Sequence, residues 1–401
     1  PYEGPITPVA SDFLRERLAE AATAGVDAAV IQLDTPGGLD SAMRMIIKDI
    51  LASPVPVIVH VAPPGARAAS AGAFITVAAH AAAMAPGTNI GSASPVQMGG
   101  GIADTTMAAK VENDAAAYIA SLARQRGRDE DLARRFVTEA LNLTATEARE
   151  AGMIDIVAPT TAAVLDSLDG RTVTLAAGER TLALAGAQVE ERPMGTRRSL
   201  LKLLANPNVA YILMLIGIYG LFFELSNPGA FAPGILGAIS LLLALFAFQA
   251  LPVNYAGIAL ILLGTVLLIL EIKVPSFGVL TIGGVTALVL GSLMLFDSAQ
   301  PWAQLSLRVM IPALAVFVGF FVLCVMLVVR GQRRQPVSGP QSLVGEHGRV
   351  VVAIGGGEAR GKVVFHGEIW DAVADRPLAE KDRVEVTAIE DRVARVRPLD
   401  H

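Results

Sequence analysis

The chain has little of the residues that usually build disulfide frameworks, metal centres and histidine-based active sites. Among its 401 residues there is one cysteine, Cys324, which lies in an apolar run. A single cysteine excludes a disulfide within the chain and a cysteine-ligated metal site. No histidine occurs between His80 and His347. We therefore expect no metal and no cofactor, and we expect any hydrolytic site here to use a base other than histidine.

Charged residues are also scarce. They make up 17% of the chain, against about 25% in ordinary soluble proteins, and the mean hydropathy is +0.53. Part of the chain should therefore lie in lipid. The net charge of −5 is small for this length and does not favour nucleic acid as a partner. Because the first residue is proline, we expect that a segment such as a secretory signal peptide precedes it.

The first region, residues 1–190, has the pattern of a soluble α/β domain. Short apolar runs at 28–33 and 55–61 are typical of buried strands, and helical patterns occur at 12–24 and 39–51. Strands that alternate with helices predict βαβ units and a parallel sheet. A linker at 191–208 follows.

The second region, residues 209–329, predicts a multi-span membrane domain. A helix needs about 20 apolar residues to cross the hydrocarbon core of a bilayer. Five consecutive runs come close to this length, at 209–225, 234–251, 256–272, 278–296 and 309–329. A set of buried core helices is the alternative, and five such runs in a row disfavour it.

An internal repeat relates two pairs of these runs. Leu221–Glu224 resembles Leu268–Glu271 at an offset of 47 residues (271 − 224), and Gly237 and Gly284 keep the same offset. The repeat predicts two hairpins of one design. Its two glutamates could be functional inside the membrane, but each precedes a proline turn, which favours a position at the interface, where Lys273 could pair with Glu271.

The third region follows a basic linker at 330–342. Residues 343–401 contain five short strands with alternating polarity, which predict a small β-barrel of the OB type. Phe365 and Trp370 are too few aromatic residues for a platform that stacks bases, so a docking role is favoured over nucleic-acid binding.

The arginines of the basic linker favour a cytoplasmic position for the C-terminal domain. Five crossings then place residues 1–208 outside, in an extracellular or periplasmic space. Arg197, Arg198 and Lys202 lie on that outer side and argue against this topology. If one run is re-entrant, both soluble domains share a side.

Ser70 is the candidate nucleophile, because small residues surround it at a strand-to-helix junction. The first 200 residues contain only two lysines. Lys48 lies in a charged helix and has the pattern of a surface lysine. Lys110 lies among alanines and methionine, where desolvation could make its amine a base. The alternative is an ordinary exposed lysine.

Backbone amides near Ser70 could stabilise the oxyanion of acyl transfer. Gly37 and Gly38 follow a strand, and Ala71 follows the serine directly. A plain strand-to-helix turn is the alternative interpretation. The glycine-rich segment 97–104 could form a flexible loop that gates the cleft, or it could be a spacer.

Three motifs resemble those of the NfeD family of membrane-bound ClpP-class serine peptidases: Leu33–Gly38, Ala69–Gly72 and Ala85–Ala93. The resemblance covers nearly the whole chain. It implies a ClpP/crotonase-like α/β domain, an α-helical membrane domain and an all-β OB-like domain. It also implies a Ser70–Lys110 dyad, an oxyanion hole from Gly37, Gly38 and Ala71, and assembly into a homo-oligomer.

The resemblance further implies cleavage of apolar peptide segments and a link to a stomatin-like (SPFH) membrane protein. Two other functions remain open. The chain could be mainly a membrane scaffold that assembles with such a partner, with weak peptidase activity. It could also be an enzyme like signal peptide peptidases, which the five runs and the C-terminal barrel disfavour.

Overall fold

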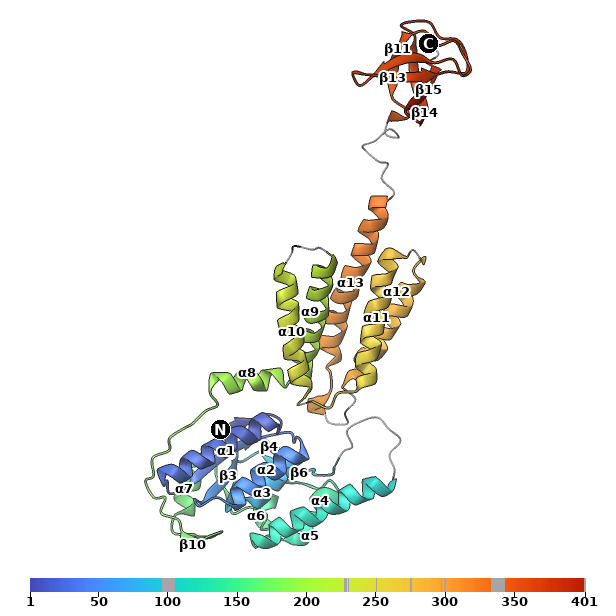
Figure 1. Ribbon diagram of the computed structural model, residues 1–401. Helices are drawn as coiled ribbons and strands as arrows, with labels where there is room; N and C mark the ends of the chain where they lie inside the picture. The colour runs from blue at the N-terminus through green and yellow to red at the C-terminus, as the bar shows by residue number, and fades with distance from the viewer. Residues whose placement is uncertain are drawn as a thin grey trace. The chain divides into compact units, whose positions relative to one another are not determined.

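The computed structural model describes residues 1–95, 105–226, 229, 231–249, 251–274, 276–296, 298, 301–332 and 343–399. The chain divides into two compact units, residues 1–319 and 320–401. The first unit contains the N-terminal α/β domain and most of the apolar helices (Figure 1). The second unit contains the end of the last apolar helix and the C-terminal barrel.

A five-stranded, fully parallel sheet forms the centre of the N-terminal domain, in the order β1-β2-β3-β5-β8. All five residues of the central strand β3 are buried, as expected for a parallel sheet that helices cover on both faces. The strands are β1 (Tyr2–Glu3), β2 (Ala29–Asp34), β3 (Val57–Val61), β5 (Ala81–Met84) and β8 (Ile156–Val157).

A second, smaller sheet carries the residue that precedes the candidate nucleophile. It contains β4 (Arg67–Ala69), β6 (Asn89–Gly91) and β7 (Asn142–Thr144), and a bridge between Thr35 and Ala68 joins it to the end of β2. A hairpin of β9 (Thr172–Leu175) and β10 (Gly178–Thr181) follows later. The helices of the domain are α1 (Pro8–Ala24), α2 (Asp40–Leu51), α3 (Ala71–Ala78), α4 (Thr105–Gln125), α5 (Glu130–Thr138), α6 (Ala145–Glu150), α7 (Thr161–Leu168) and α8 (Thr196–Leu204).

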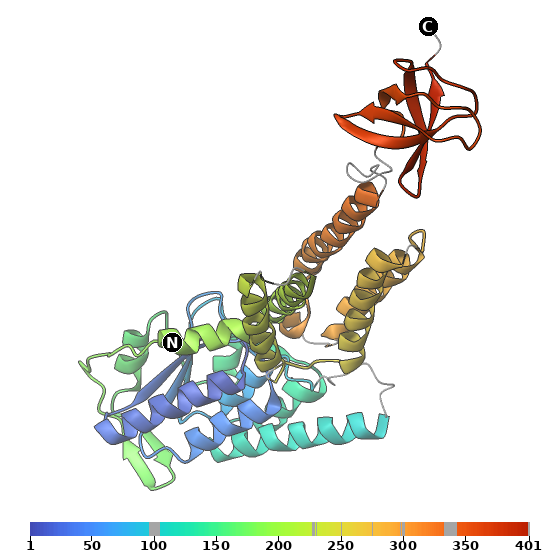
Figure 2. The ribbon, with the colours of Figure 1, turned by 45° about the horizontal axis from the view of Figure 1, so that its top comes forward.

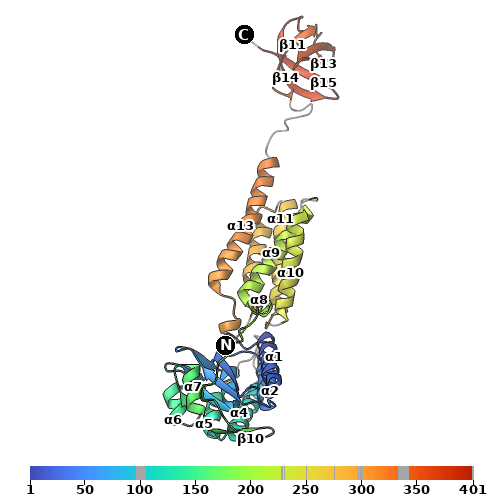
Figure 3. The ribbon, with the colours of Figure 1, turned by 90° about the vertical axis from the view of Figure 1, so that its left-hand side faces the viewer.

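Five apolar helices follow α8. Four have at least 18 residues and enough hydropathy to cross a membrane, and α12 is shorter at 17 residues. The pairs α9–α10 and α11–α12 lie side by side (Figures 1 and 3). The helices are α9 (Pro207–Ser226), α10 (Phe231–Phe248), α11 (Tyr255–Lys273), α12 (Val279–Leu295) and α13 (Leu307–Gln332), with a short 3-10 helix, η1 (Pro301–Ala303), before α13.

The internal repeat has a physical counterpart in how the two hairpins pack. A Cβ atom on Gly217 of α9 would lie 2.8 Å from Leu241 of α10. At the same offset of 47 residues, a Cβ atom on Gly264 of α11 would lie 2.7 Å from Leu288 of α12. Each hairpin therefore needs a glycine at the same point, because small residues let membrane helices approach closely.

Glu271 caps the helix that follows it. Its carboxylate accepts hydrogen bonds from the hydroxyl of Ser276 at 2.7 Å and from the amides of Gly278 and Thr281 at 3.1 and 3.0 Å. The side chain of Glu224 in the first hairpin lies against Gly234, which the offset of 47 relates to Thr281. A carboxylate at a helix N-terminus satisfies free amides and interacts well with the helix dipole, so the environment of Glu271 is that of a cap.

The C-terminal domain is a closed five-stranded barrel in the order β11-β12-β13-β15-β14 (Figure 2). Strand β13 pairs parallel with β15, and the other pairs are antiparallel. This is the Greek-key arrangement of an OB-type barrel. The strands are β11 (His347–Val352), β12 (Gly361–Phe365), β13 (Glu368–Val373), β14 (Arg383–Glu390) and β15 (Val393–Pro398).

Candidate active site

Ser70 is the single residue that joins β4 to α3, and its backbone has an unusual conformation. Its φ is +52° and its ψ is −115°, a region that residues with a side chain seldom occupy. Two backbone bonds of 2.9 Å hold this turn: the Ser70 amide donates to Gly91, and the Ser70 carbonyl accepts from Ala73. A sharp turn of this kind presents a hydroxyl at the end of a helix, as the nucleophile elbow of α/β-hydrolases does.

Gly37 lies against the Ser70 side chain. A Cβ atom on Gly37 would lie 2.8 Å from Ser70 Cβ and 3.2 Å from its Oγ, and the φ of Gly37 is +117°. A larger residue at this position would therefore be strained and would press on the hydroxyl. The structure thus brings the glycine turn and the serine together, although 33 residues separate them (70 − 37).

Two of the three expected oxyanion donors have free amides. Gly38 lies opposite Ile6 in a parallel bridge. The Ile6 amide donates to the Gly37 carbonyl, and the Leu39 amide donates to the Ile6 carbonyl, both at 2.8 Å. The amide of Gly38 therefore points away from Ile6. Ala71 is the first residue of α3, where helix amides have no partner inside the helix. Across the described ranges neither amide donates a hydrogen bond to the chain.

The Gly37 amide differs from these two, because it already has a hydrogen-bond partner. It donates to Thr35 Oγ1 at 3.1 Å, and the Thr35 hydroxyl in turn donates to the Gly37 carbonyl at 3.1 Å. Thr35 is fully buried. Its hydroxyl satisfies an amide that the sequence pattern alone leaves open, so the role of Gly37 is to give space to Ser70.

Helix α3 is entirely buried, and its C-terminal end is capped by arginines. All eight of its residues are buried. Arg128 donates to the carbonyls of Thr76, at 3.0 Å, and Val77. Arg126 donates to the carbonyl of Ala78 at 2.9 Å. Cations at a helix C-terminus satisfy free carbonyls and interact favourably with the dipole, so the helix behind Ser70 is fixed at its far end.

Asp155 balances the charge of Arg128 and ties it to the sheet. Its carboxylate lies 3.2 Å from Arg128 and 2.7 Å from Arg171, and it accepts a 2.7 Å bond from the amide of Ala82 in β5. Burial lowers the pKa of the Arg128 guanidinium, and the Asp155 charge opposes this shift. A buried arginine keeps its charge, and a partner such as Asp155 compensates its loss of water.

Lys110 lies on α4 and is exposed to solvent. The second half of α4 packs in the domain: Tyr118 stacks on Phe74 of α3 at 6.0 Å, and Asp114 pairs with Arg44 of α2 at 2.5 Å. Lys110 lies one turn before Asp114 and on the same side of the helix. It makes no hydrogen bond to Ser70 in the described part of the chain. The structure thus places Lys110 on the exposed part of the helix that packs on α3.

The two histidines of this domain have structural partners. The ring of His60 is buried, and its Nε2 lies 3.1 Å from the Ala158 carbonyl. His80 Nδ1 accepts a bond of 3.1 Å from the Val57 amide. Burial, and then the charge of Arg126, lower the pKa of His80 to about 4. Neither ring is an alternative base for Ser70 on these contacts. The glycine-rich segment 97–104 lies outside the described residues.

Comparisons with known proteins cover each region of the chain. Family models match residues 1–191 (the NfeD1b N-terminal domain), 208–328 (the NfeD integral membrane domain) and 340–398 (the NfeD-like C-terminal, partner-binding domain). The chain is 33% identical over 381 residues to the membrane-bound protease PH1510 of Pyrococcus horikoshii, covering 92% of this chain and 85% of that protein. The chain belongs to the NfeD family.

A second curated protein and a solved structure are also similar to this NfeD chain. The membrane protein NfeD1b of Bacillus subtilis is 26% identical over 406 residues, covering 97% of this chain and 90% of that protein. A solved structure of the 1510-N membrane-bound stomatin-specific protease, a lysine-to-alanine variant with a substrate peptide, is 34% identical. The structural match covers 50% of this chain and 94% of the solved chain, with a TM-score of 0.48.

The predicted fold class of this NfeD protein is confirmed: an α/β domain with a parallel sheet, an apolar helical region and a C-terminal β-barrel. The sequence analysis missed two contributors to the site, Thr35 and Arg128. Thr35 lies in the Leu33–Gly38 motif, so its place next to the glycine turn could have indicated its role. Arg128 gave no signal, because its partners on α3 lie about 50 residues away along the chain.

Proposed function

We propose that the chain is a membrane-anchored serine endopeptidase that uses a Ser70–Lys110 dyad. The conformation of Ser70 carries this proposal. Ser70 has a positive φ and lies between a strand and a buried helix, Gly37 lies against its side chain, and Ala71 follows it directly. We propose that Ser70 is the nucleophile and that the amides of Gly38 and Ala71 form the oxyanion hole, the two parts of acyl transfer that a fold must position.

The reaction would proceed in two steps. Ser70 Oγ attacks the carbonyl carbon of the peptide while Lys110 Nζ takes the hydroxyl proton, and the amides of Gly38 and Ala71 bind the oxyanion. The amine then leaves with a proton from Lys110, and an acyl-enzyme ester remains. Water attacks this ester with Lys110 again as base, which releases the acid and regenerates the Ser70 hydroxyl.

The exposure of Lys110 sets a condition on this mechanism. An amine acts as a base only when it is neutral, and a dry environment favours the neutral form. Met107 and Val111 on the same part of α4 are also exposed, at 53% and 43%. We therefore propose that the chain works as a homo-oligomer, in which a second copy covers this half of α4 and shields Lys110 from water.

We propose an apolar peptide segment of a stomatin-like membrane protein as the substrate. Two observations support this class. A 34% identical relative is a stomatin-specific protease solved with a substrate peptide. The C-terminal barrel matches the partner-binding domain of the family, and we propose that it docks the same partner. The barrel strands carry acidic as well as basic residues, which does not favour nucleic acid.

We propose that the peptidase domain lies outside the cell membrane and the barrel inside it. The Ser306 amide donates to Asn208 Oδ1 at 2.9 Å, so α9 and α13 begin at the same end of the bundle. The α9–α10 and α11–α12 hairpins each return the chain to that end (Figure 3). Helix α13 then leaves at the other end and leads to the basic linker at 330–334, which favours the cytoplasm.

The test is cleavage of a co-expressed stomatin-like protein from the same organism, in membranes, by wild type, Ser70→Ala and Lys110→Ala. Ser121→Ala and Lys48→Ala are matched controls at positions that the mechanism does not use. Cleavage that both site variants abolish and both controls keep supports the dyad. Cleavage that survives in Lys110→Ala alone means that another group is the base.

A membrane scaffold is the second candidate. The observation that favours it is that Lys110, the proposed base, is exposed to solvent. In this case the wild type and both site variants leave the stomatin-like protein intact but co-purify with it, and deletion of residues 343–401 abolishes the co-purification. That result would replace the peptidase proposal.

A further inference from the structure

Helix α8 joins the peptidase domain to the first membrane helix, and one of its sides is fixed to the peptidase domain. Arg198 pairs with Glu16 of α1. The Lys202 ammonium donates to the Glu3 carbonyl and lies 5.6 Å from the centre of the Tyr2 ring. These contacts set the position of α8 relative to the domain that holds Ser70.

The other side of α8 carries two leucines that nothing in the described residues covers. Leu200 is 57% exposed and Leu203 is 54% exposed. They lie three residues apart and therefore on one side of the helix. Pro207, where the first membrane helix begins, follows Leu203 by four residues (207 − 203). A short apolar face this close to a membrane span is in position to enter the bilayer surface.

The polar residues around this face are basic. From Arg192 to Asn208 the chain has four basic residues and no acidic one, and η1 and the start of α13 add Arg308 and again no acidic residue. Arg308 is exposed and has no ion-pair partner among the residues that the structure describes. Anionic headgroups attract such positions.

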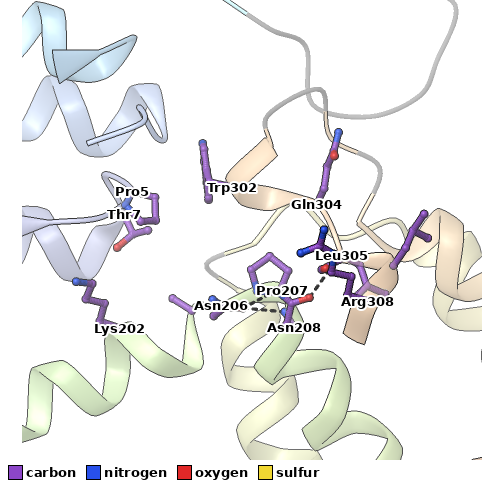
Figure 4. A pocket seen from close by; sticks show the side chains of 13 residues that line it. Pro5, Thr7, Lys202, Asn206, Pro207, Asn208, Trp302, Gln304, Leu305 and Arg308 are labelled. Atoms are coloured by element: carbon purple, nitrogen blue, oxygen red, sulfur yellow. Dashed lines mark hydrogen bonds between the residues drawn. The ribbon is translucent and has the colours of Figure 1, made fainter. Parts of the chain in front are cut away.

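A cavity of about 730 Å³ opens beside α8 at the start of the bundle (Figure 4). Its lining includes Lys202, Asn206, Asn208, Trp302, Ser306 and Arg308. It thus combines two cations with amide and hydroxyl groups that can bind phosphate oxygens. Trp302 contributes the amphipathic ring that is common at bilayer interfaces.

We propose that α8 lies in the bilayer surface through Leu200 and Leu203, and that the adjoining cavity binds the headgroup of an anionic phospholipid between Lys202 and Arg308. The lipid then sets the height and orientation of the peptidase domain above the membrane, because the opposite side of α8 is fixed to that domain. This proposal concerns lipid binding alone and does not depend on peptidase activity.

The first experiment measures depth. In the full chain with Cys324→Ala, a single cysteine replaces Leu200, Leu203 or, as a control, the exposed Asp131 of α5, and each carries an environment-sensitive fluorophore. In nanodiscs of phosphatidylcholine and phosphatidylglycerol, we expect nitroxide lipids to quench the probes at 200 and 203 but not at 131. If nitroxide lipids quench the probes at 200 and 203 no more than the probe at 131, the proposal is wrong.

The second experiment measures headgroup choice. The chain has two tryptophans, so Trp370→Phe leaves Trp302 as the only energy donor to a dansyl-labelled phosphatidylglycerol. Unlabelled phosphatidylglycerol should displace the label roughly tenfold better than phosphatidylcholine, and inorganic phosphate should not displace it. Equal displacement by phosphatidylcholine, or displacement by phosphate alone, overturns an anionic lipid site.

A matched pair of variants completes the test. In the same Trp370→Phe chain, Arg308→Gln should remove the preference for phosphatidylglycerol. Arg330→Gln makes the same change near the other end of α13 and should keep it. Circular dichroism should show that the Arg308→Gln chain keeps its helix content. If that chain still prefers phosphatidylglycerol, the assignment of Arg308 to the site is wrong.

Discussion

Helices α3 and α4 carry the two halves of the candidate dyad, and they differ sharply in their surroundings. Every residue of α3 is buried, its first residue follows Ser70, and arginines cap its last turn. In contrast, the first half of α4, which carries Lys110, is mostly exposed, and it extends away from the domain (Figure 2).

The difference shows that one chain alone buries the surroundings of Ser70 but not those of Lys110. The candidate nucleophile and the helix that follows it are held by buried contacts inside the N-terminal domain. The surroundings of the base are not complete in the described residues of one chain. We propose that such a site is active only when a second copy or a substrate covers the first half of α4. Substitutions in and around α3 should therefore cost more stability than substitutions in the first half of α4.

The largest expected effect comes from breaking the cap of α3. In Arg128→Met, the carbonyls of Thr76 and Val77 lose their donor and Asp155 loses one of its two cationic partners. Removing one member of a buried ion pair costs about 3–5 kcal/mol. We expect a loss of this size in the free energy of unfolding of the peptidase domain, measured by denaturant titration, with faster amide exchange in α3.

Arg124→Met is the matched control for that variant. Arg124 lies at the end of α4 and pairs with Glu130 on the surface at 2.5 Å. An exposed pair contributes about 0–1 kcal/mol. If Arg128→Met costs no more than Arg124→Met, the cap does not stabilise α3.

The next effect is a dependence on pH through His80. Its pKa is lowered to about 4 in the folded chain, whereas an unfolded chain has the ordinary value of about 6.5. Above pH 6.5 the ring is neutral in both states. As the pH falls, the unfolded state takes up the proton first, so stability decreases between about pH 6.5 and pH 4 by up to about 3 kcal/mol.

His80→Asn should flatten this part of the curve, because it keeps an acceptor for the Val57 amide and does not titrate. His366→Asn, at an exposed position of the barrel, should leave the curve of the peptidase domain unchanged. Thermal unfolding of the full chain across this pH range gives the comparison. An unchanged slope in His80→Asn would show that other groups cause it.

A smaller effect is expected for Thr35→Val, which keeps the shape of the side chain and removes its hydroxyl. The Gly37 amide then loses its partner in a buried position, which costs about 1–3 kcal/mol. Thr138→Val, on the exposed surface of α5, should cost less than about 0.5 kcal/mol. Equal losses in the two variants would show that the Thr35 hydroxyl does not hold the glycine turn.

The smallest effect on stability is expected for Lys110→Ala, although its expected effect on cleavage is complete. An exposed helix position without ion-pair contacts in the described ranges should change the free energy of unfolding by less than about 0.5 kcal/mol. Lys48→Ala should be as mild and should keep cleavage. A loss of stability near 2 kcal/mol in Lys110→Ala would show that Lys110 is already buried in the assembled protein.

Local patterns were sufficient to predict much of the fold. The strands expected at 28–33 and 55–61 match β2 (Ala29–Asp34) and β3 (Val57–Val61), and the five apolar runs lie within a few residues of α9–α13. Alternation of polarity predicted the five barrel strands. These features follow from the sequence because strand and helix periods, and the length of an apolar run, depend on neighbouring residues alone.

The site was only partly predictable. The glycine turn and Ser70 were recognised from short motifs, but these motifs did not show that the Gly37 amide donates to the Thr35 hydroxyl. A short motif shows which amides are near a nucleophile. It does not show which of them a buried hydroxyl already satisfies, because that depends on how the chain folds back on itself.

The sequence by itself determined the order of the three regions, the repeat in the membrane helices and the identity of the candidate nucleophile. The tertiary structure alone decided that Arg128 and Asp155 fix the helix behind Ser70, that Glu271 caps α12, and that Lys110 is exposed. The physical reason is range. Secondary structure and hydropathy are local properties, whereas hydrogen-bond partners, burial and exposure depend on residues that are distant along the chain.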